Sequence, residues 1–222
     1  MSNTICRVFT KQRGEYEQKY QFTTYSDIFS LDKFEGDMNF LMHYLRDVFI
    51  DGIKQQHPPK ISSEVALDFN RKSVSQGPRL QVAVEEIKHP LVALAEEANY
   101  RGNGNQQHPI VQRHAFANDP DMLAYEIPVY DDEWEGHIDI LRVVKQGINL
   151  DECGKAEGKS KIEHPFRFEI VDFKPEAHKE TKAASQVWRY CNLFAQCTKI
   201  PLELIDGIYY DDRHAYQIGN LT

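Results

Sequence analysis

The chain of 222 residues lacks any long apolar segment, which limits the classes of protein to which it can belong. No run approaches the ~18 apolar residues that a membrane-spanning helix needs. Residues 1–20 are polar, carry Arg7, Lys11, Arg13 and Lys19, and lack the apolar region of a secretory signal. We therefore expect a cytoplasmic protein with no membrane partner.

Cysteine is scarce as well. The four cysteines, Cys6, Cys153, Cys191 and Cys197, show no C-x-x-C spacing and are too few for a disulfide framework. This usage is typical of a reducing compartment.

The chain also has no excess of positive charge. Lysine and arginine number 26 against 34 acidic residues, which gives a net charge of −8. This balance argues against a basic protein that coats nucleic acid through long-range attraction, but it leaves room for a local basic patch. Hydrophobic residues make up 41%, which is enough for a core and excludes general disorder.

The first hundred residues carry mainly helical signals. Residues 1–25 are expected to form a short hairpin or an arm. Apolar residues at helical spacing predict a helix over residues 37–55, and residues 64–69 read as a strand. A second helix is expected over residues 83–99, where Pro90 must kink the helix or start it afresh.

The second half of the chain reads as strands followed by a helix and further strands. The segment from Pro109 to Phe116 is expected to form a short helix. Strands are expected over residues 123–129, 134–144, 166–174, 203–210 and 213–218, with a helix over residues 179–197 between the third and the fourth. This order predicts an α/β fold in which helices flank a mixed sheet.

Each of three expected consecutive strands carries an acid among apolar neighbours. These acids are Glu126, Asp139 and Asp172. Lys174 shares a strand face with Asp172, and Pro175 ends the strand directly afterwards. Buried carboxylates are costly unless they are paired or bind a metal. If the strands are neighbours, the three acids could converge on a hard cation such as Mg²⁺ or Mn²⁺.

The helix after the third strand adds two polar side chains. Gln186 stands at the edge of the apolar stripe of this helix, one turn before Tyr190. This amide and phenol could face the acids and contact a phosphate or a base.

Taken in order, Glu126, Gly136-x-x-Asp139, Asp172-x-Lys174 and Gln186-x-x-x-Tyr190 resemble the PD-(D/E)XK nuclease superfamily, and more closely its RecB-type exonuclease branch. That branch also includes the exonucleases of CRISPR adaptation. The resemblance covers residues 108–218, and Ile138 replaces the proline of the motif's name. It implies a restriction-endonuclease-like core over residues 101–222, with a mainly helical addition over residues 1–100 that is packed on the core or continuous with it.

The resemblance also implies roles for these residues in metal-dependent hydrolysis of DNA phosphodiester bonds. Asp139, Asp172, the carbonyl of Phe173 and Glu126 would hold Mg²⁺ or Mn²⁺. Lys174 would orient the attacking water and help to deprotonate it. Gln186 and Tyr190 would position single- or double-stranded DNA.

Three further features bear on this resemblance. The branch often places an extra histidine ligand on a preceding helix, for which His114 is the better candidate here and His108 the weaker. The late cysteines do not match the set that holds an iron–sulfur cluster in some members, so no cluster is expected. Lysines 155, 159 and 161 between Asp139 and Asp172 either grip a phosphate backbone or belong to a solvated loop.

Other functions remain open from the sequence. The same chemistry would serve a nuclease acting on RNA or on branched DNA. A catalytically idle nuclease fold could bind nucleic acid or protein, and residues 1–100 could supply a surface for a protein partner. In a plain α/β interaction domain, the three acids would be unrelated surface residues.

Overall fold

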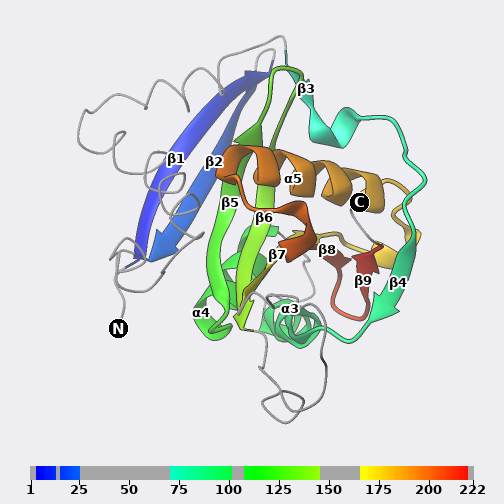
Figure 1. The fold of residues 1–222 in the computed structure, drawn as a ribbon. Coiled ribbons are helices and arrows are strands. Elements are labelled where there is room, and N and C mark those ends of the chain that lie inside the picture. Colours follow the sequence, from blue (N-terminus) through cyan, green and yellow to red (C-terminus); the bar gives the residue numbers. More distant parts are fainter. Residues whose placement is uncertain (1–3, 14–15, 26–70, 102–107, 146–165, 220–222) are drawn as a thin grey trace, which may run out of the picture.

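The structure, a computed structural model, describes residues 4–13, 16–25, 71–101, 108–145 and 166–219 (Figure 1). The strands are β1 (Thr4–Arg13), β2 (Tyr16–Tyr25), β3 (Lys72–Ser73), β4 (Val84–Ile87), β5 (Met122–Tyr130), β6 (Trp134–Lys145), β7 (Phe166–Phe173), β8 (Ile205–Tyr210) and β9 (Ala215–Ile218). The α-helices are α3 (Pro90–Arg101), α4 (His108–Asn118) and α5 (Ala183–Thr198). Short 3₁₀ turns are η4 (Val74–Gln76), η6 (Ala177–Lys179) and η7 (Leu202–Leu204).

The strands form one mixed sheet. Its order is β1-β2-β5-β6-β7-β8-β9-β4, and β3 pairs with β6 off this path. The strand pairs β7–β8 and β3–β6 are parallel, and the other pairs are antiparallel. Strand β7 reaches its parallel neighbour β8 through α5, as expected for a crossover that must span the sheet.

Helices cover both faces of this sheet, so the chain has the predicted α/β architecture of a mixed sheet flanked by helices (Figure 1). Alternate residues of β7 divide between two apolar clusters. Ile170 packs in the cluster that contains Val187 of α5. Val171 and Phe173 pack in the cluster formed with α3 and α4. The alternation of a strand therefore sets which helix each side chain meets.

Residues on both sides of position 100 belong to the same sheet. Strand β2 pairs with β5, and β4 pairs with β9. Residues 4–13 and 16–25 pair as the two strands of a hairpin, as expected for residues 1–25. The helix expected over residues 37–55 and the strand expected over residues 64–69 lie outside the described residues, as do the lysines at positions 155, 159 and 161.

Proline marks where the helical prediction for residues 83–99 fails. Residues 84–87 form β4 at the end of the sheet order, and α3 begins at Pro90. A proline at the first helical position loses no hydrogen bond, whereas the extended residues before it can pair with β9. No helix in the described part of the chain combines the length and the apolar character that crossing a membrane requires.

Candidate active site

The three strand acids lie in one row across β5, β6 and β7. Tyr125 pairs with Ile140 and Ile127 with Ile138, which places Glu126 opposite Asp139. Ile140 pairs with Val171, and the same register, continued by one residue, places Asp139 opposite Asp172. Since neighbouring strands are about 4.8 Å apart, the sheet itself brings the three carboxylates together.

The backbone at Glu126 is unusual for a strand. Its φ angle is 57°, in the left-handed region that non-glycine residues seldom adopt. The residues around it also change faces: Tyr125 packs with α4, whereas Ile127 packs with the α5 cluster. Such a conformation costs on the order of 1–3 kcal/mol and is concentrated at functional sites.

Asp139, at the centre of the row, is tied to two elements. Its Oδ2 accepts a hydrogen bond from the backbone N–H of Phe173 at 2.9 Å and lies 3.1 Å from Nδ1 of His108. Burial alone would raise the pKa of Asp139, but the hydrogen bond and charge of His108, together with Lys174, hold it below its usual value. Asp139 is therefore ionised at neutral pH.

Asp172 and Lys174 form a buried ion pair at the end of β7. The Lys174 Nζ lies 2.7 Å from Oδ2 of Asp172, whose side chain is 1% exposed. Burial and the charge of Asp139 raise the pKa of Asp172 to about 7, although Lys174 opposes this shift. Burial would lower the pKa of Lys174, but the two aspartates raise it, so its amine is an ammonium.

Glu126 completes the row on the other side of Asp139. Its Oε1 accepts a hydrogen bond from Nε2 of Gln112 at 2.9 Å. Burial, followed by the charge of Asp139, raises the pKa of Glu126 to about 7. Two of the three carboxyls in the row, Glu126 and Asp172, therefore have pKa values raised to about 7, because burial and the charge of Asp139 disfavour their ionised forms.

The histidine that reaches this row is His108, not His114. His108 and Gln112 are four residues apart on α4 and both meet the row, because residues at this spacing share a helix face. His114 lies on another side of α4, where its Nε2 is 3.1 Å from Oε2 of Glu97. The structure thus places the weaker sequence candidate, His108, beside the row, and the preferred candidate, His114, beside Glu97. The sequence analysis did not single out Gln112.

Gln186 and Tyr190 approach the row from α5. Nε2 of Gln186 donates a hydrogen bond to the Tyr190 hydroxyl at 3.0 Å. Burial, followed by the charges of Asp172 and Asp139, raises the pKa of Tyr190 well above its usual value. The phenol therefore stays protonated near the acids and can act as a hydrogen-bond donor.

Gly136 makes room for the tyrosine ring. A Cβ atom at this position would lie 2.5 Å from Cε1 of Tyr190, a contact too short for real atoms. The glycine of the G-x-x-D pattern thus has a packing reason on β6, because Tyr190 of α5 lies directly over its backbone.

The chemistry of the row suits a hard divalent cation. Carboxylate oxygens from three strands are the ligands that Mg²⁺ and Mn²⁺ prefer, and Lys174 and His108 are the basic side chains in contact with them. The oxygens of Glu126, Asp139 and Asp172 do not all lie within 4.8 Å of one another, so binding would draw the carboxylates inward. The backbone of Phe173 is held beside the row by its N–H bond to Asp139.

Comparison of the chain with protein-family models, with curated proteins and with solved structures finds no match.

Proposed function

We propose that the chain is a metal-dependent nuclease that hydrolyses phosphodiester bonds of DNA, with exonuclease-like action. The observation that carries this proposal is the row of Glu126, Asp139 and Asp172 across three strands, with the Lys174 ammonium beside it. An interaction domain has no need to place three carboxylates in one row, two of them buried and two of them with raised pKa values.

The order of the parts supports assignment to the PD-(D/E)XK superfamily and a restriction-endonuclease-like core. Glu126 in β5 is followed by the G-x-x-D pattern in β6, the D-x-K pattern in β7 and the Q-x-x-x-Y pattern in α5. This sequence of elements is the one that the resemblance implies for its RecB-type branch.

The row is proposed to hold Mg²⁺ or Mn²⁺ through Glu126, Asp139, Asp172 and the carbonyl of Phe173. Such a cation supplies Lewis-acid stabilisation of the charge that develops on the phosphoryl oxygens. Asp139 is already ionised, and the two outer acids would release their protons when the cation binds.

For Lys174 we propose a narrower role than the resemblance implies. Because its amine is held protonated by Asp172 and Asp139, it acts as a hydrogen-bond donor that orients the attacking water and stabilises negative charge. In this state it has no free lone pair with which to accept a proton. Gln186 and the Tyr190 hydroxyl are proposed to position the phosphate or base on the α5 side of the row.

The test is cleavage of labelled linear DNA, nicked circular DNA and RNA by the purified chain in Mg²⁺, Mn²⁺ or EDTA. Asp172→Asn and Lys174→Ala remove the proposed machinery. Lys179→Ala is the matched control, since Lys179 is an exposed lysine in the next turn of chain and pairs only with exposed Glu176 in the described contacts.

Metal-dependent cleavage that is lost in Asp172→Asn and Lys174→Ala but kept in Lys179→Ala is the expected result. Shortening from DNA ends, with nicked circles intact, would fit exonuclease action; preferential cleavage of RNA would change the substrate within the same chemistry. Folded wild-type protein that cleaves none of these substrates in either metal would overturn the proposal.

A further inference from the structure

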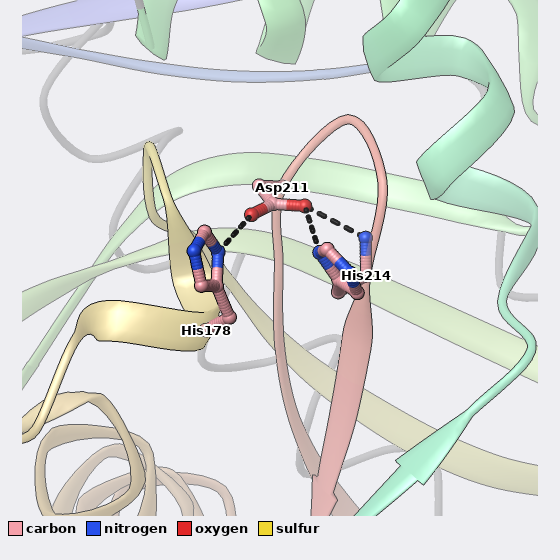
Figure 2. A group of neighbouring side chains, drawn as sticks. All are labelled: His178, Asp211 and His214. Atoms are coloured by element: carbon pink, nitrogen blue, oxygen red, sulfur yellow. Dashed lines mark hydrogen bonds and ion pairs between the residues drawn. The ribbon is translucent and has the colours of Figure 1, made fainter.

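A second group of metal-ligating side chains lies outside the acidic row, where two loops meet. His178 belongs to η6, just after β7, whereas Asp211 and His214 belong to the turn between β8 and β9. Figure 2 shows the two imidazoles on either side of the Asp211 carboxylate, each with a ring nitrogen directed toward it.

The imidazole rings of His178 and His214 lie too far from the Asp211 carboxylate for side-chain hydrogen bonds to it. Nδ1 of His178 lies 3.9 Å from Oδ2 of Asp211, and Nδ1 of His214 lies 3.5 Å from Oδ1. Nδ1 of His214 is buried and has no hydrogen-bond partner. An orphaned buried nitrogen is costly, so a ligand that bonds to Nδ1 of His214 would remove this cost.

Asp211 is held in place before any ligand arrives. Its Oδ1 accepts the backbone N–H groups of Arg213 and His214 at 2.8 and 2.7 Å, and its Oδ2 accepts that of Ala177 at 2.7 Å. Burial would raise the pKa of Asp211, but these three backbone donors hold it below the usual value. Oδ2 accepts a single donor in these contacts, so a lone pair remains for a cation on the side of His178.

We propose that His178, Asp211 and His214 bind a borderline divalent cation, with Zn²⁺ as the best fit. Metal–ligand distances of about 2.0–2.1 Å place tetrahedral ligands about 3.3 Å apart, so the imidazoles, now 3.5 and 3.9 Å from different oxygens of Asp211, would move a short way toward a shared cation. One ligand atom of each of the three residues lies within 4.8 Å of the other two, and among the described residues this is the group of histidine, cysteine, aspartate or glutamate side chains found at such a spacing. Two imidazoles and one carboxylate select Zn²⁺ over Mg²⁺, in contrast to the all-oxygen row.

The site would link two segments that carry the acidic row. Lys174 donates its backbone N–H to the carbonyl of Tyr210, the residue before Asp211. Three residues after Pro175, His178 returns to the same turn. A cation bound here would clamp the chain that follows Lys174 onto the β8–β9 turn, and it would do so whatever reaction the row performs.

The test is calorimetric titration of the tag-free, chelator-treated full chain with Zn²⁺ while excess Mg²⁺ is present. The variants are His178→Ala and His214→Gln. Asp211 is left intact, because its loss would break three backbone hydrogen bonds and so disturb the fold. His114→Gln controls for the loss of a histidine elsewhere, and Asp172→Asn controls for binding at the acidic row. Co²⁺ absorption then identifies the ligand type.

We expect one Zn²⁺ per chain, bound at least about tenfold more weakly in each of the two site variants and equally well in both controls. The Co²⁺ spectrum should show nitrogen and oxygen ligation without an intense thiolate charge-transfer band. The proposal is overturned by wild-type protein that binds no Zn²⁺, by site variants that bind as wild type does, or by binding that is lost in Asp172→Asn instead.

Discussion

At the scale of single residues, the acidic row is a set of carboxylates with unequal protonation. Glu126 and Asp172 have pKa values raised to about 7 by burial and by the charge of Asp139, whose own pKa is lowered. Of the two neighbouring aspartates, Asp172 is therefore the more readily protonated. A divalent cation competes with these protons, so the same arrangement that stores protons at neutral pH sets the pH at which a metal binds.

The first prediction concerns this competition. The pKa values of Glu126 and Asp172 are higher in the folded protein than in the unfolded chain. Their protonated forms therefore stabilise the metal-free fold fully when the pH is below the pKa of the unfolded chain, and this stabilisation is lost as the pH rises through the folded value of about 7. The affinity for the metal rises over the same pH interval, because the carboxyls lose their protons and can then bind the cation. The rise in melting temperature caused by Mn²⁺ should therefore grow between about pH 6 and about pH 8. Scanning fluorimetry measures it, and a rise that shrinks over this interval would contradict the assignment.

The second prediction separates the two histidines of α4. His108→Gln removes the charge 3.1 Å from Asp139, whereas His114→Gln removes a contact with Glu97 away from the row. We expect His108→Gln to change the affinity for Mn²⁺ by about tenfold and His114→Gln to leave it unchanged. Equal effects of the two variants in a Mn²⁺ titration would refute the placement of His108.

At the scale of elements, the contact of α5 with β6 depends on a missing side chain. Gly136→Ala would place a methyl group 2.5 Å from the Tyr190 ring and 3.3 Å from Val74. We expect a loss of about 1–3 kcal/mol in the free energy of unfolding, as for other overpacked cores. Urea denaturation measures the loss, and the double variant Gly136→Ala, Tyr190→Leu should lose less than the sum of the two single variants. Strict additivity would contradict this contact.

A buried charge network joins β6 and β7 on the other face of the sheet. Arg142 is 3% exposed and pairs with Asp119, Asp121 and Glu169, and His89 also contacts Glu169. Removal of the guanidinium would leave Asp119 buried without its partner.

Arg142→Met should therefore cost about 3–5 kcal/mol of unfolding free energy. Lys179→Met, which breaks the exposed pair with Glu176, should leave the unfolding free energy nearly unchanged, because solvent screens this pair. Chemical denaturation of both variants makes the comparison, and similar small losses would show that the Arg142 network does not hold the strands together.

At the scale of the whole molecule, one sheet joins segments from both halves of the chain. Strand β4 pairs with β9, and β2 pairs with β5, so the described residues before and after position 100 share a core. A boundary near residue 100 therefore does not separate two sheets.

The last prediction is that the chain has one main unfolding transition. Trp134 in β6 and Trp188 in α5 report on the central sheet and its helix, whereas far-ultraviolet circular dichroism reports on all the elements. The midpoints from the two signals should coincide in urea. Separate midpoints would instead show that a part of the chain unfolds independently of the central sheet.

The sequence alone determined the features that depend on local spacing. Alternation placed Ile170 and Asp172 on one face of β7, Pro90 marked the start of α3, and the order of acids along the chain indicated which strands carry them. These predictions succeeded because strand and helix periodicities act over a few residues.

Only the tertiary structure decided which distant residues meet. The register of the strands aligned Glu126, Asp139 and Asp172. The face that α4 turns toward the row carries His108 and not His114. The β8–β9 turn placed Asp211 and His214 beside His178. Residues 84–87 became a strand because β9 offered free backbone groups to pair with, a partner that lies about 130 residues further along the chain. Such contacts depend on long-range pairing and packing, which no local pattern encodes.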